Sequence, residues 1–391
     1  MKKPNVLIFI EWYKPGYKAG GPIVSISNMV DAMRDIFNFY IVTSNKDHMT
    51  KEPLNVITNQ WTEIDNAQVL YLSDPTQIGN ENIKDIVLTK GQFKTIICNS
   101  LWSKYFTLIP LKKYKQHAER TFLFPRGMLG KGALKVKPFK KLIGLLVLKL
   151  LGIYKDVVWL GTSINEINAI KKHFNTDRIH LAPNFYNPKL EEYVSREKQK
   201  DELKIIFPAR VNRVKNLLFA VNILSKIDKK YRVTMDIYGE CDDVVYYNDV
   251  LRKIKKHKLN VIFKKPFKPE QCVEIYSKYH IAFLPTQHEN YGHSIVEAMA
   301  AKMPVVISRN TPWTNLNVKS IGYDIDLKKP EEFVQVITNF TKMNQDEYDN
   351  YRKRNDFTSL INQKHTKSIY ETLLHNGFVY FNDHIDPIYY D

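Results

Sequence analysis

The sequence predicts an α/β protein with two domains, each built on a doubly wound parallel β-sheet. Its 391 residues are more than one hydrophobic core usually serves. Short β-branched runs alternate with helical patterns along most of the chain, and this order is typical of parallel strands joined by crossover helices. Hydrophobic residues make up 44% and charged residues 25%, which excludes a disordered or low-complexity chain.

The first domain is expected over residues 1–186, with six strands. They are Val6–Ile10, Tyr40–Thr43, Val69–Leu72, Thr95–Asn99, Thr121–Phe124 and Val157–Leu160. The first run is too short for the apolar core of a secretory signal, which needs about 7–15 residues, and Glu11 ends it. We therefore interpret it as a strand.

The second domain is expected over residues 187–362, with five strands. They are Leu203–Phe207, Val233–Tyr238, Val261–Phe263, Ile281–Leu284 and Val305–Ser308. The boundary lies near residue 187, where Pro183–Pro188 and then a charged stretch make a natural linker. Residues 363–391 are expected to form a helix that ends near Leu374 and an aromatic tail, which return to the first domain.

The cysteines and one apolar stretch indicate the cellular compartment of the protein. Cys98, Cys241 and Cys272 are widely spaced and odd in number, so they suit neither a disulfide framework nor a zinc site, and a reducing cytoplasm fits them best. The apolar stretch Leu142–Leu160 is interrupted by charged residues, whereas a bilayer span needs about 20 apolar residues. No transmembrane helix is expected.

Positive charge is concentrated in one segment. The chain carries a net charge of +17, and residues 104–149 hold twelve basic residues against a single acid, Glu119. The segment includes the apolar helix Leu142–Leu148, and basic residues beside apolar surface suit an anionic membrane. A solvated basic face is the plain alternative. Nucleic acid is the less favoured partner, because no recognition module accompanies the charge.

A glycine turn follows the first strand. Gly20, Gly21 and Pro22 precede a helix expected from about Ile23 to Met33. Glycine lets a ligand approach the backbone, and the N–H groups at a helix N-terminus bind phosphate. By itself such a turn is also consistent with an ordinary loop.

A cluster of cations follows the first strand of the second domain. Arg210, Arg213 and Lys215 lie directly after Leu203–Phe207. Cations at the carboxyl end of a strand can clamp a diphosphate, and arginine can do so with two hydrogen bonds. A solvated basic loop is the equal alternative on this evidence.

The most informative stretch is residues 285–301, which follow an apolar strand and open a helix near Gly292. Glu289 lies in the loop and Glu297 a turn or more into the helix. A loop carboxylate can accept hydrogen bonds from sugar hydroxyls, and a helix carboxylate can hold a ribose diol. The spacing, the glycine and the strand–helix context together disfavour two unconnected surface glutamates.

Here the sequence resembles the retaining glycosyltransferases of family 4. The resemblance rests on the two glutamates and on further motifs between positions 14 and 316. These are Gly20-Gly21-Pro22, Pro125-Arg126-Gly127-Met128-Leu129, Thr162-Ser163-Ile164-Asn165-Glu166, Pro183-Asn184, Arg210 with Lys215, and Thr311-Pro312-Trp313-Thr314-Asn315-Leu316. It implies the GT-B fold, in which two Rossmann-like domains face a central cleft.

The resemblance also implies a role for each matching position. The implied catalytic residues are Glu289, which would orient the transferred sugar, and Arg210 and Lys215, which would neutralise the departing diphosphate. The implied donor-binding residues are Gly20, Gly21, Glu297, Asn290, Tyr291 and Gly292. Arg126 stands where many relatives have histidine, and it is expected to contact phosphate or an acidic acceptor.

The function so implied is transfer of a hexose from a nucleotide sugar to a glycan or lipid-linked saccharide, with retention of anomeric configuration, as in surface polysaccharide biosynthesis. The enzyme would work in the cytoplasm or at the inner face of the membrane. The residues leave the donor base open between UDP and GDP. No cofactor or metal is expected, because Asp324-Ile325-Asp326 comes late in the chain and His288 and His293 lack further ligands.

Two alternatives stay open at this point. A sugar-nucleotide epimerase or a phosphorylase-like enzyme would keep the fold and change the reaction. A non-enzymatic basic protein that binds lipid or nucleic acid would use residues 104–149 and not the glutamates.

Overall fold

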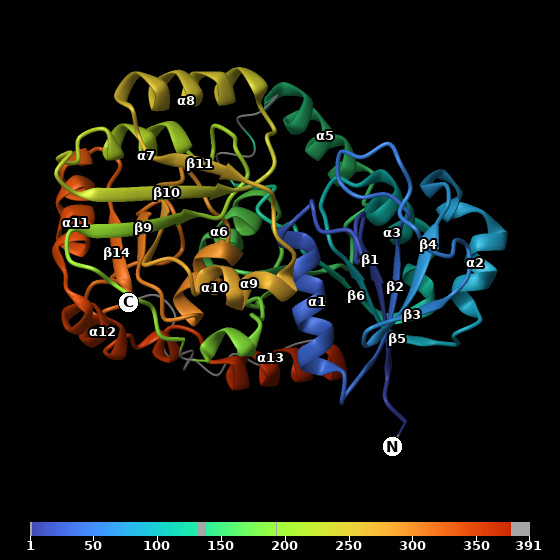
Figure 1. Ribbon diagram of the computed structural model, residues 1–391. Coiled ribbons are helices and arrows are strands. Elements are labelled where there is room, and N and C mark those ends of the chain that lie inside the picture. Colours follow the sequence, from blue (N-terminus) through green and yellow to red (C-terminus); the bar gives the residue numbers. More distant parts are fainter. Residues whose placement is uncertain (1, 131–133, 135–137, 193, 377–391) are drawn as a thin grey trace. The chain divides into compact units, whose positions relative to one another are not determined.

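The computed structural model describes residues 2–130, 134, 138–192 and 194–376 (Figure 1). It divides into two compact units. The first runs to Phe185 and resumes at Gln363, and the second runs from Tyr186 to Asn362. The aromatic tail of the sequence analysis, residues 377–391, lies outside the described residues, as do 131–133 and 135–137 of the basic segment.

The first unit is built on an eight-stranded sheet in the order β3-β4-β2-β1-β5-β6-β7-β8. All neighbours are parallel except β3, which pairs antiparallel with β4 at the edge. The chain starts at β1, proceeds to one side, and crosses to β5 on the other side, which makes the sheet doubly wound. The strands are β1 (Asn5–Phe9), β2 (Asn38–Ser44), β3 (Thr62–Ile64), β4 (Ala67–Leu72), β5 (Phe93–Cys98), β6 (Ala118–Leu123), β7 (Val158–Gly161) and β8 (Ile179–Leu181).

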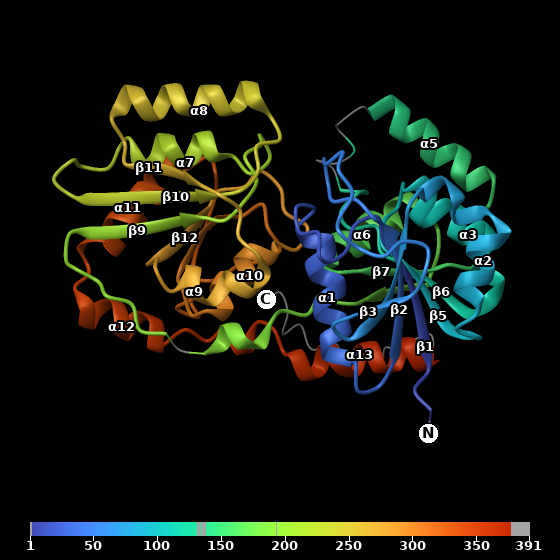
Figure 2. The ribbon, with the colours of Figure 1, turned by 45° about the vertical axis from the view of Figure 1, so that its right-hand side comes forward.

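Helices cover both faces of this sheet. They are α1 (Gly21–Met33), α2 (Glu81–Leu88), α3 (Ile109–Lys113), α5 (Pro138–Leu150), α6 (Ile164–His173) and α13 (Gln363–Asn376). Strand β1 shows why two layers are needed, because its side chains alternate between faces. Val6 and Ile8 join the core under α1 and α13, whereas Leu7 and Phe9 join the core under α2 and α3. Figures 1 and 2 both show α1 and α2 on opposite sides of the strands.

The second unit is built on a six-stranded sheet in the order β11-β10-β9-β12-β13-β14, and all of its strand pairs are parallel. The strands are β9 (Glu202–Phe207), β10 (Arg232–Tyr238), β11 (Val261–Lys264), β12 (Ile281–Leu284), β13 (Val305–Ser308) and β14 (Gly322–Ile325). The helices are α7 (Leu217–Leu224), α8 (Val244–His257), α9 (Cys272–Tyr276), α10 (His293–Ala300), α11 (Pro330–Lys342) and α12 (Gln345–Lys353). Strand order therefore reverses between β9 and β12, and doubly wound sheets bind ligands at the carboxyl ends of the strands at such a switch point.

The predicted fold class is confirmed, and each predicted strand is present with ends shifted by a few residues at most. Three strands were missed. Two of them, β3 and β8, are only three residues long, too short for a period of two to be recognised. The third, β14, reads Gly-Tyr-Asp-Ile, and its glycine and aspartate resemble a turn. Among the described residues, no helix has the length and apolar character needed to cross a bilayer.

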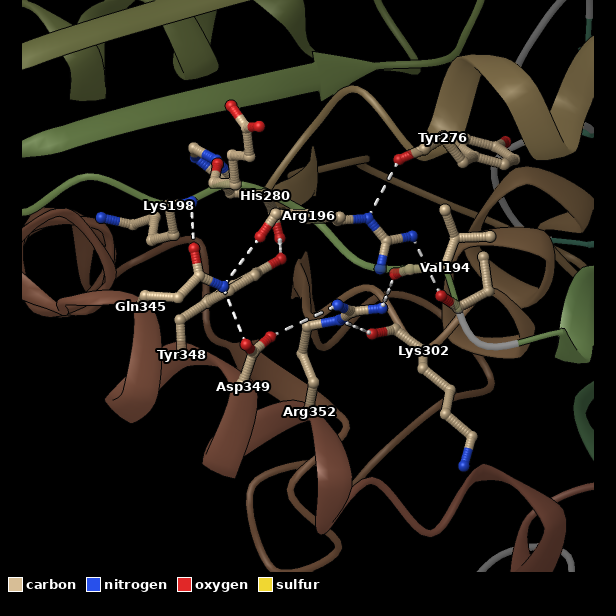
Figure 3. A network of polar contacts seen from close by, with 12 residues as sticks. Val194, Arg196, Lys198, Tyr276, His280, Lys302, Gln345, Tyr348, Asp349 and Arg352 are labelled. Atoms are coloured by element: carbon tan, nitrogen blue, oxygen red, sulfur yellow. Dashed lines mark hydrogen bonds and ion pairs between the residues drawn. The ribbon is translucent and has the colours of Figure 1, made fainter.

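A buried polar network ties the segment that enters the second unit to its helices (Figure 3). Arg196 donates hydrogen bonds to the carbonyl oxygens of Tyr276, at 3.2 Å, and Ala301, at 3.0 Å. Lys198 donates to the carbonyl oxygen of Thr341 at 3.1 Å, and burial lowers the pKa of its ammonium group to about 8. Helix ends leave carbonyl groups without partners inside the helix, so these cations satisfy groups that would otherwise be buried unpaired.

Arg352 is the most buried cation of this network, and it predicts a stability effect. Its side chain is 0% exposed, and it donates to the carbonyl oxygens of Lys302, at 2.9 Å, and Val194, at 2.8 Å. Arg352→Met should lower the free energy of unfolding by about 3 kcal/mol, because both carbonyl groups lose a charged donor. The exposed neighbour provides a control, since Lys353→Met removes the same charge and should change stability by less than about 0.5 kcal/mol. Equal urea midpoints for the two variants would contradict this role.

Candidate functional site

The candidate site lies where β9 and β12 end side by side in the second unit. These strands pair in parallel, so the loops that follow them, 208–216 and 285–292, leave the same edge of the sheet. Hydrogen bonds join the loops directly. The amide of Gln287 donates to Val214 O at 2.7 Å, and the side-chain amide of Asn216 donates to Pro285 O at 3.0 Å.

This junction brings together two residues that the sequence analysis selected from distant positions. The ammonium group of Lys215 donates to Glu289 Oε2 at 2.5 Å, and both side chains are mostly buried. The loop around Glu289 depends on Gly292, which has φ of 80° at the start of α10. A Cβ at position 292 would lie 2.9 Å from Glu289 Cγ, so a larger residue there would displace the carboxylate.

Arg210 follows the end of β9 and pairs with a carboxylate in the loop after β10. Its guanidinium lies 3.1 Å from Asp242 Oδ2, and its side chain is 42% exposed. Asp242 also accepts from the side-chain amide of Asn212 at 2.9 Å, which holds the loop in place. Asp242 was not predicted from the sequence, although its place shortly after an expected strand was a signal that could have indicated it.

Gly239 explains how the two loops come so close. A Cβ at this position would lie 2.1 Å from Ala209 O, which no real side chain tolerates. The glycine after β10 therefore allows the backbone before Arg210 to pass directly beside it. Asp242 reaches Arg210 because of this close approach.

Glu297 lies on α10 and is held by a buried tyrosine. The hydroxyl of Tyr276 donates to Glu297 Oε2 at 3.0 Å. Burial raises the pKa of the Glu297 carboxyl to about 7, although the hydrogen bond from Tyr276 acts in the opposite direction. Tyr276 was also missed by the sequence analysis, because nothing in the spacing relates α9 to α10. The carboxyl group therefore changes its charge near neutral pH.

Not every predicted donor residue turns a side chain toward this junction. Tyr291 is buried in the core of the second unit, where its ring packs against Trp313 and its carbonyl accepts from the indole N–H at 2.6 Å. Its side chain therefore serves packing. Asn290 and Gly292 flank it in the loop that carries Glu289.

The predicted glycine turn belongs to the first unit. Gly20 has φ of 66° and caps α1, which begins at Gly21. A Cβ at position 20 would meet nothing within 4 Å, so the left-handed backbone, and not lack of space, is what favours glycine there. In the first turn of α1, Pro22 has no N–H group and the amide of Ile23 already donates to Gly20 O at 3.0 Å. This helix N-terminus therefore offers an anion fewer backbone donors than usual.

Arg126 also lies in the first unit, where it has protein partners of its own. It donates from Nε to Asn99 Oδ1 at 2.6 Å and through a terminal nitrogen to Asn184 Oδ1 at 2.7 Å. Its guanidinium stacks 4.1 Å from the ring centre of Phe124, and burial lowers its pKa. These contacts join the loops after β5, β6 and β8. The interpretation of Arg126 as a ligand contact remains a prediction.

The neighbouring loop is organised by Glu166. Its carboxylate accepts from the amide of Gly127 at 2.5 Å and from the amide of Thr162 at 2.8 Å. The Pro125–Leu129 and Thr162–Glu166 motifs of the sequence analysis are thus parts of one hydrogen-bonded structure.

Metal ligands do not gather in the described part of the chain, where no group of three or more His, Cys, Asp or Glu side chains is placed to hold an ion. Asp324 lies on β14 and accepts from the amide of Leu316 at 3.0 Å.

The family comparison covers the unit that holds this junction. Residues 189–356 match the family of glycosyl transferases group 1. This region, less than half of the chain, is therefore similar to the group 1 glycosyl transferases. It contains Arg210, Lys215, Glu289 and Glu297, so the four selected residues all fall within the family's shared domain.

Two curated proteins are similar to part of the chain. An uncharacterised glycosyltransferase of Methanocaldococcus jannaschii is 27% identical over 167 residues, which cover 39% of this chain and 42% of that protein. An uncharacterised 41.2 kDa protein from the cps region of Klebsiella pneumoniae is 22% identical over 231 residues, which cover 57% and 59%. The chain therefore spans about half the length of the curated relatives it matches.

Solved structures resemble the chain over nearly its whole length. Sucrose-phosphate synthase from Thermosynechococcus elongatus has a TM-score of 0.71 at 14% identity and covers 95% of this chain and 98% of its own. HepE from Anabaena, solved with UDP and glucose, has a TM-score of 0.63 at 13% identity and covers 94% and 99%. At this level of identity the likeness shows the fold, which is GT-B.

Proposed function

We propose that this protein is a retaining glycosyltransferase that moves a hexose from a nucleotide sugar to a saccharide acceptor. The observation that carries the proposal is the Lys215–Glu289 contact of 2.5 Å at the β9–β12 switch point, inside the region similar to the group 1 glycosyl transferases. It joins a cation, which would bind phosphate, to a carboxylate, which would accept hydrogen bonds from sugar hydroxyls. A donor molecule has both groups within a few bonds of each other.

The reaction breaks the bond between the anomeric carbon and the diphosphate, whose oxygen leaves with the electron pair. Lys215 and Arg210 would stabilise the negative charge that develops on the diphosphate. Such electrostatic stabilisation of the transition state is usually the largest single contribution to catalysis. The acceptor hydroxyl would attack the same face of the sugar and pass its proton to the departing phosphate. Retention by this route needs no protein nucleophile.

Both cations can serve a ligand while keeping their present partners. Lysine carries three donor hydrogens and arginine five, and the contacts to Glu289 and Asp242 use only a part of them. Each carboxylate would hold its cation in place until the diphosphate arrives. Glu289 would then accept hydrogen bonds from the sugar, and Glu297 from the ribose.

The class of donor and acceptor is proposed from the relatives. HepE was solved with UDP and glucose, which favours a UDP-sugar, with GDP-sugars as the alternative. The Klebsiella pneumoniae relative comes from a cps region, which favours a glycan or lipid-linked acceptor in surface polysaccharide biosynthesis. A cytoplasmic location fits the three free cysteines, two of them buried and Cys241 exposed. No metal or other cofactor is part of the proposal.

The test is turnover of UDP- and GDP-sugars in the presence of mono- and oligosaccharide acceptors, with release of nucleoside diphosphate as the readout. We expect release with one base, dependent on acceptor, and a product whose anomeric configuration by NMR equals that of the donor. Isomerisation of the donor without acceptor would instead show an epimerase. A product with the opposite anomeric configuration would overturn the retaining assignment. Absence of turnover with every donor would overturn the assignment as a glycosyltransferase.

The raised pKa of Glu297 predicts how donor affinity depends on pH. The carboxyl is mostly protonated at pH 6 and mostly ionised at pH 8, since its pKa is about 7, and the ionised form is the better acceptor for ribose hydroxyls. Affinity for the nucleoside diphosphate should therefore rise by up to about tenfold between these pH values. Glu297→Gln should remove this part of the rise in calorimetric titrations, leaving the part due to the ligand's own phosphate. Identical slopes for the two proteins would exclude Glu297 from ribose binding.

A further inference from the structure

Helix α5 presents an apolar face to solvent. Seven large apolar residues in and just after this helix are exposed: Phe139, Leu142, Ile143, Leu146, Val147, Leu150 and Leu151. The six that lie within the helix, from Phe139 to Leu150, recur at steps of three and four residues. These steps place side chains on one face of a helix. Exposure reaches 81% at Phe139 and 79% at Leu150. A contiguous apolar surface of this kind marks an interaction site in soluble proteins.

The opposite face of α5 fixes the helix to the first unit. Leu145 is buried in the core on that side of the sheet, and Leu148 packs against the same core. Gly144 lies against the ring of Trp102, since a Cβ there would be 3.6 Å from Cζ3. The helix lies at the periphery of the first unit (Figure 2). Its exposed face is therefore held in one orientation, outward from the core.

The charge around this helix indicates what covers the apolar face. Residues 104–149, which include α5, hold twelve basic residues and one acidic residue. Among the described ones, Lys104, Lys112, Lys113 and Lys149 are exposed. A basic amphipathic surface with leucine and phenylalanine on its apolar side is what binds in the plane of an anionic bilayer.

The same charge argues against a second copy of this chain as the occupant. A two-fold interface brings identical patches together, so it would place two strongly basic segments against each other. The basic segment would be attracted to an anionic membrane surface, whereas two basic segments would repel each other. The face is also narrow, one helix wide, which suits shallow insertion.

We propose that the exposed face of α5 inserts into the interfacial layer of a membrane that contains anionic phospholipid, with the surrounding lysines contacting the headgroups. This membrane surface belongs to the first unit, whereas Arg210, Lys215, Glu289 and Glu297 belong to the second. It would place the enzyme on the bilayer by insertion of one face of α5. The inference stands on exposure and charge, and it is independent of the proposed sugar transfer.

The first test is co-sedimentation of the full chain with vesicles of phosphatidylcholine alone and with about one quarter phosphatidylglycerol. We expect binding to the anionic vesicles only. Leu146→Gln with Leu150→Gln should weaken that binding by at least about tenfold. The matched control is Val244→Gln with Val318→Gln, two similarly exposed apolar residues of the second unit, which should bind as the wild type does. Equal binding by both variants would overturn the proposal, because charge alone would then account for it.

A second test measures insertion directly. Cys98 and Cys272 are buried, and Cys241 is exposed, so Leu142→Cys in a Cys241→Ser background leaves one accessible thiol for an environment-sensitive dye. Dye emission should shift to the blue on anionic vesicles, and the same dye at Val318→Cys should not shift. An unshifted dye at position 142 would show that the helix stays outside the bilayer. A dimer in solution that Leu146→Gln with Leu150→Gln converts to monomer would identify a second copy as the occupant and overturn the lipid assignment.

Failure of this inference can be told apart from failure of the proposed function. Turnover of a water-soluble acceptor is expected to be unchanged in Leu146→Gln with Leu150→Gln, whereas vesicle binding is expected to be unchanged in Glu289→Ala.

Discussion

Glu289→Ala is expected to lower turnover of the nucleotide sugar by about 10²–10³-fold while leaving the affinity for the nucleoside diphosphate equal or higher. A group that stabilises the reacting geometry contributes to kcat in this range. The affinity should hold because the alanine removes the partner of Lys215, which lies 2.5 Å away, and leaves its ammonium group to the phosphates. Turnover by nucleotide release and affinity by calorimetry measure the two effects separately.

The control for this variant is another carboxylate of the same unit. Glu331→Ala removes an exposed residue that pairs with Lys226 on the surface, and such pairs contribute little. It should turn over as the wild type does. A Glu289→Ala enzyme of undiminished kcat would remove the residue from the reaction altogether.

Replacing Lys215 or Arg210 should weaken binding of the nucleoside diphosphate, in contrast to Glu289→Ala. Lys215→Ala and Arg210→Ala are each expected to weaken binding of the nucleoside diphosphate by about 10- to 100-fold, since a charge-assisted hydrogen bond contributes about 1.5–3 kcal/mol. They should also lower kcat/KM further, because the charge on the diphosphate grows as the bond breaks. Titration calorimetry and steady-state kinetics check the two parts.

Arg213 makes this prediction specific to position. It lies three residues from Arg210 in the same loop, is more exposed, and pairs with Asp243 at 3.0 Å. Arg213→Ala removes the same charge and should change affinity by less than about threefold. If Arg213→Ala and Arg210→Ala weakened binding equally, general electrostatic attraction would explain the data. Direct contact of Arg210 with the diphosphate would then be excluded as the explanation.

Much of the fold could be predicted because buried parallel strands read as apolar β-branched runs. Val305–Ser308 and Ile281–Leu284 needed no correction at all. The strands that escaped prediction are short edges, such as Ile179–Leu181, whose pairing depends on neighbours that local sequence does not reveal.

The site could be predicted in part for a similar reason. Residues that follow adjacent parallel strands meet at one edge of the sheet, so Lys215 and Glu289 lie together although 74 positions separate them. Asp242 and Tyr276 escaped because their partners are set by tertiary packing. Arg210 meets Asp242 only because Gly239 lets two backbone segments approach.

The protein partners of Arg126 could not be predicted from its motif. Its side chain donates to Asn99 and Asn184, and the predicted ligand contact remains a prediction. No pattern in one sequence indicates that two asparagines from the loops after other strands will hold an arginine. Burial and pairing of a charged side chain become visible only in three dimensions.

A crystal structure of the protein with the nucleoside diphosphate released from its preferred donor tests the central claim most directly. We predict that the diphosphate lies within hydrogen-bonding distance of Arg210 and Lys215, with the ribose hydroxyls on Glu297. A diphosphate bound at any other place in the second unit, with these side chains still paired only to Asp242, Glu289 and Tyr276, would contradict it.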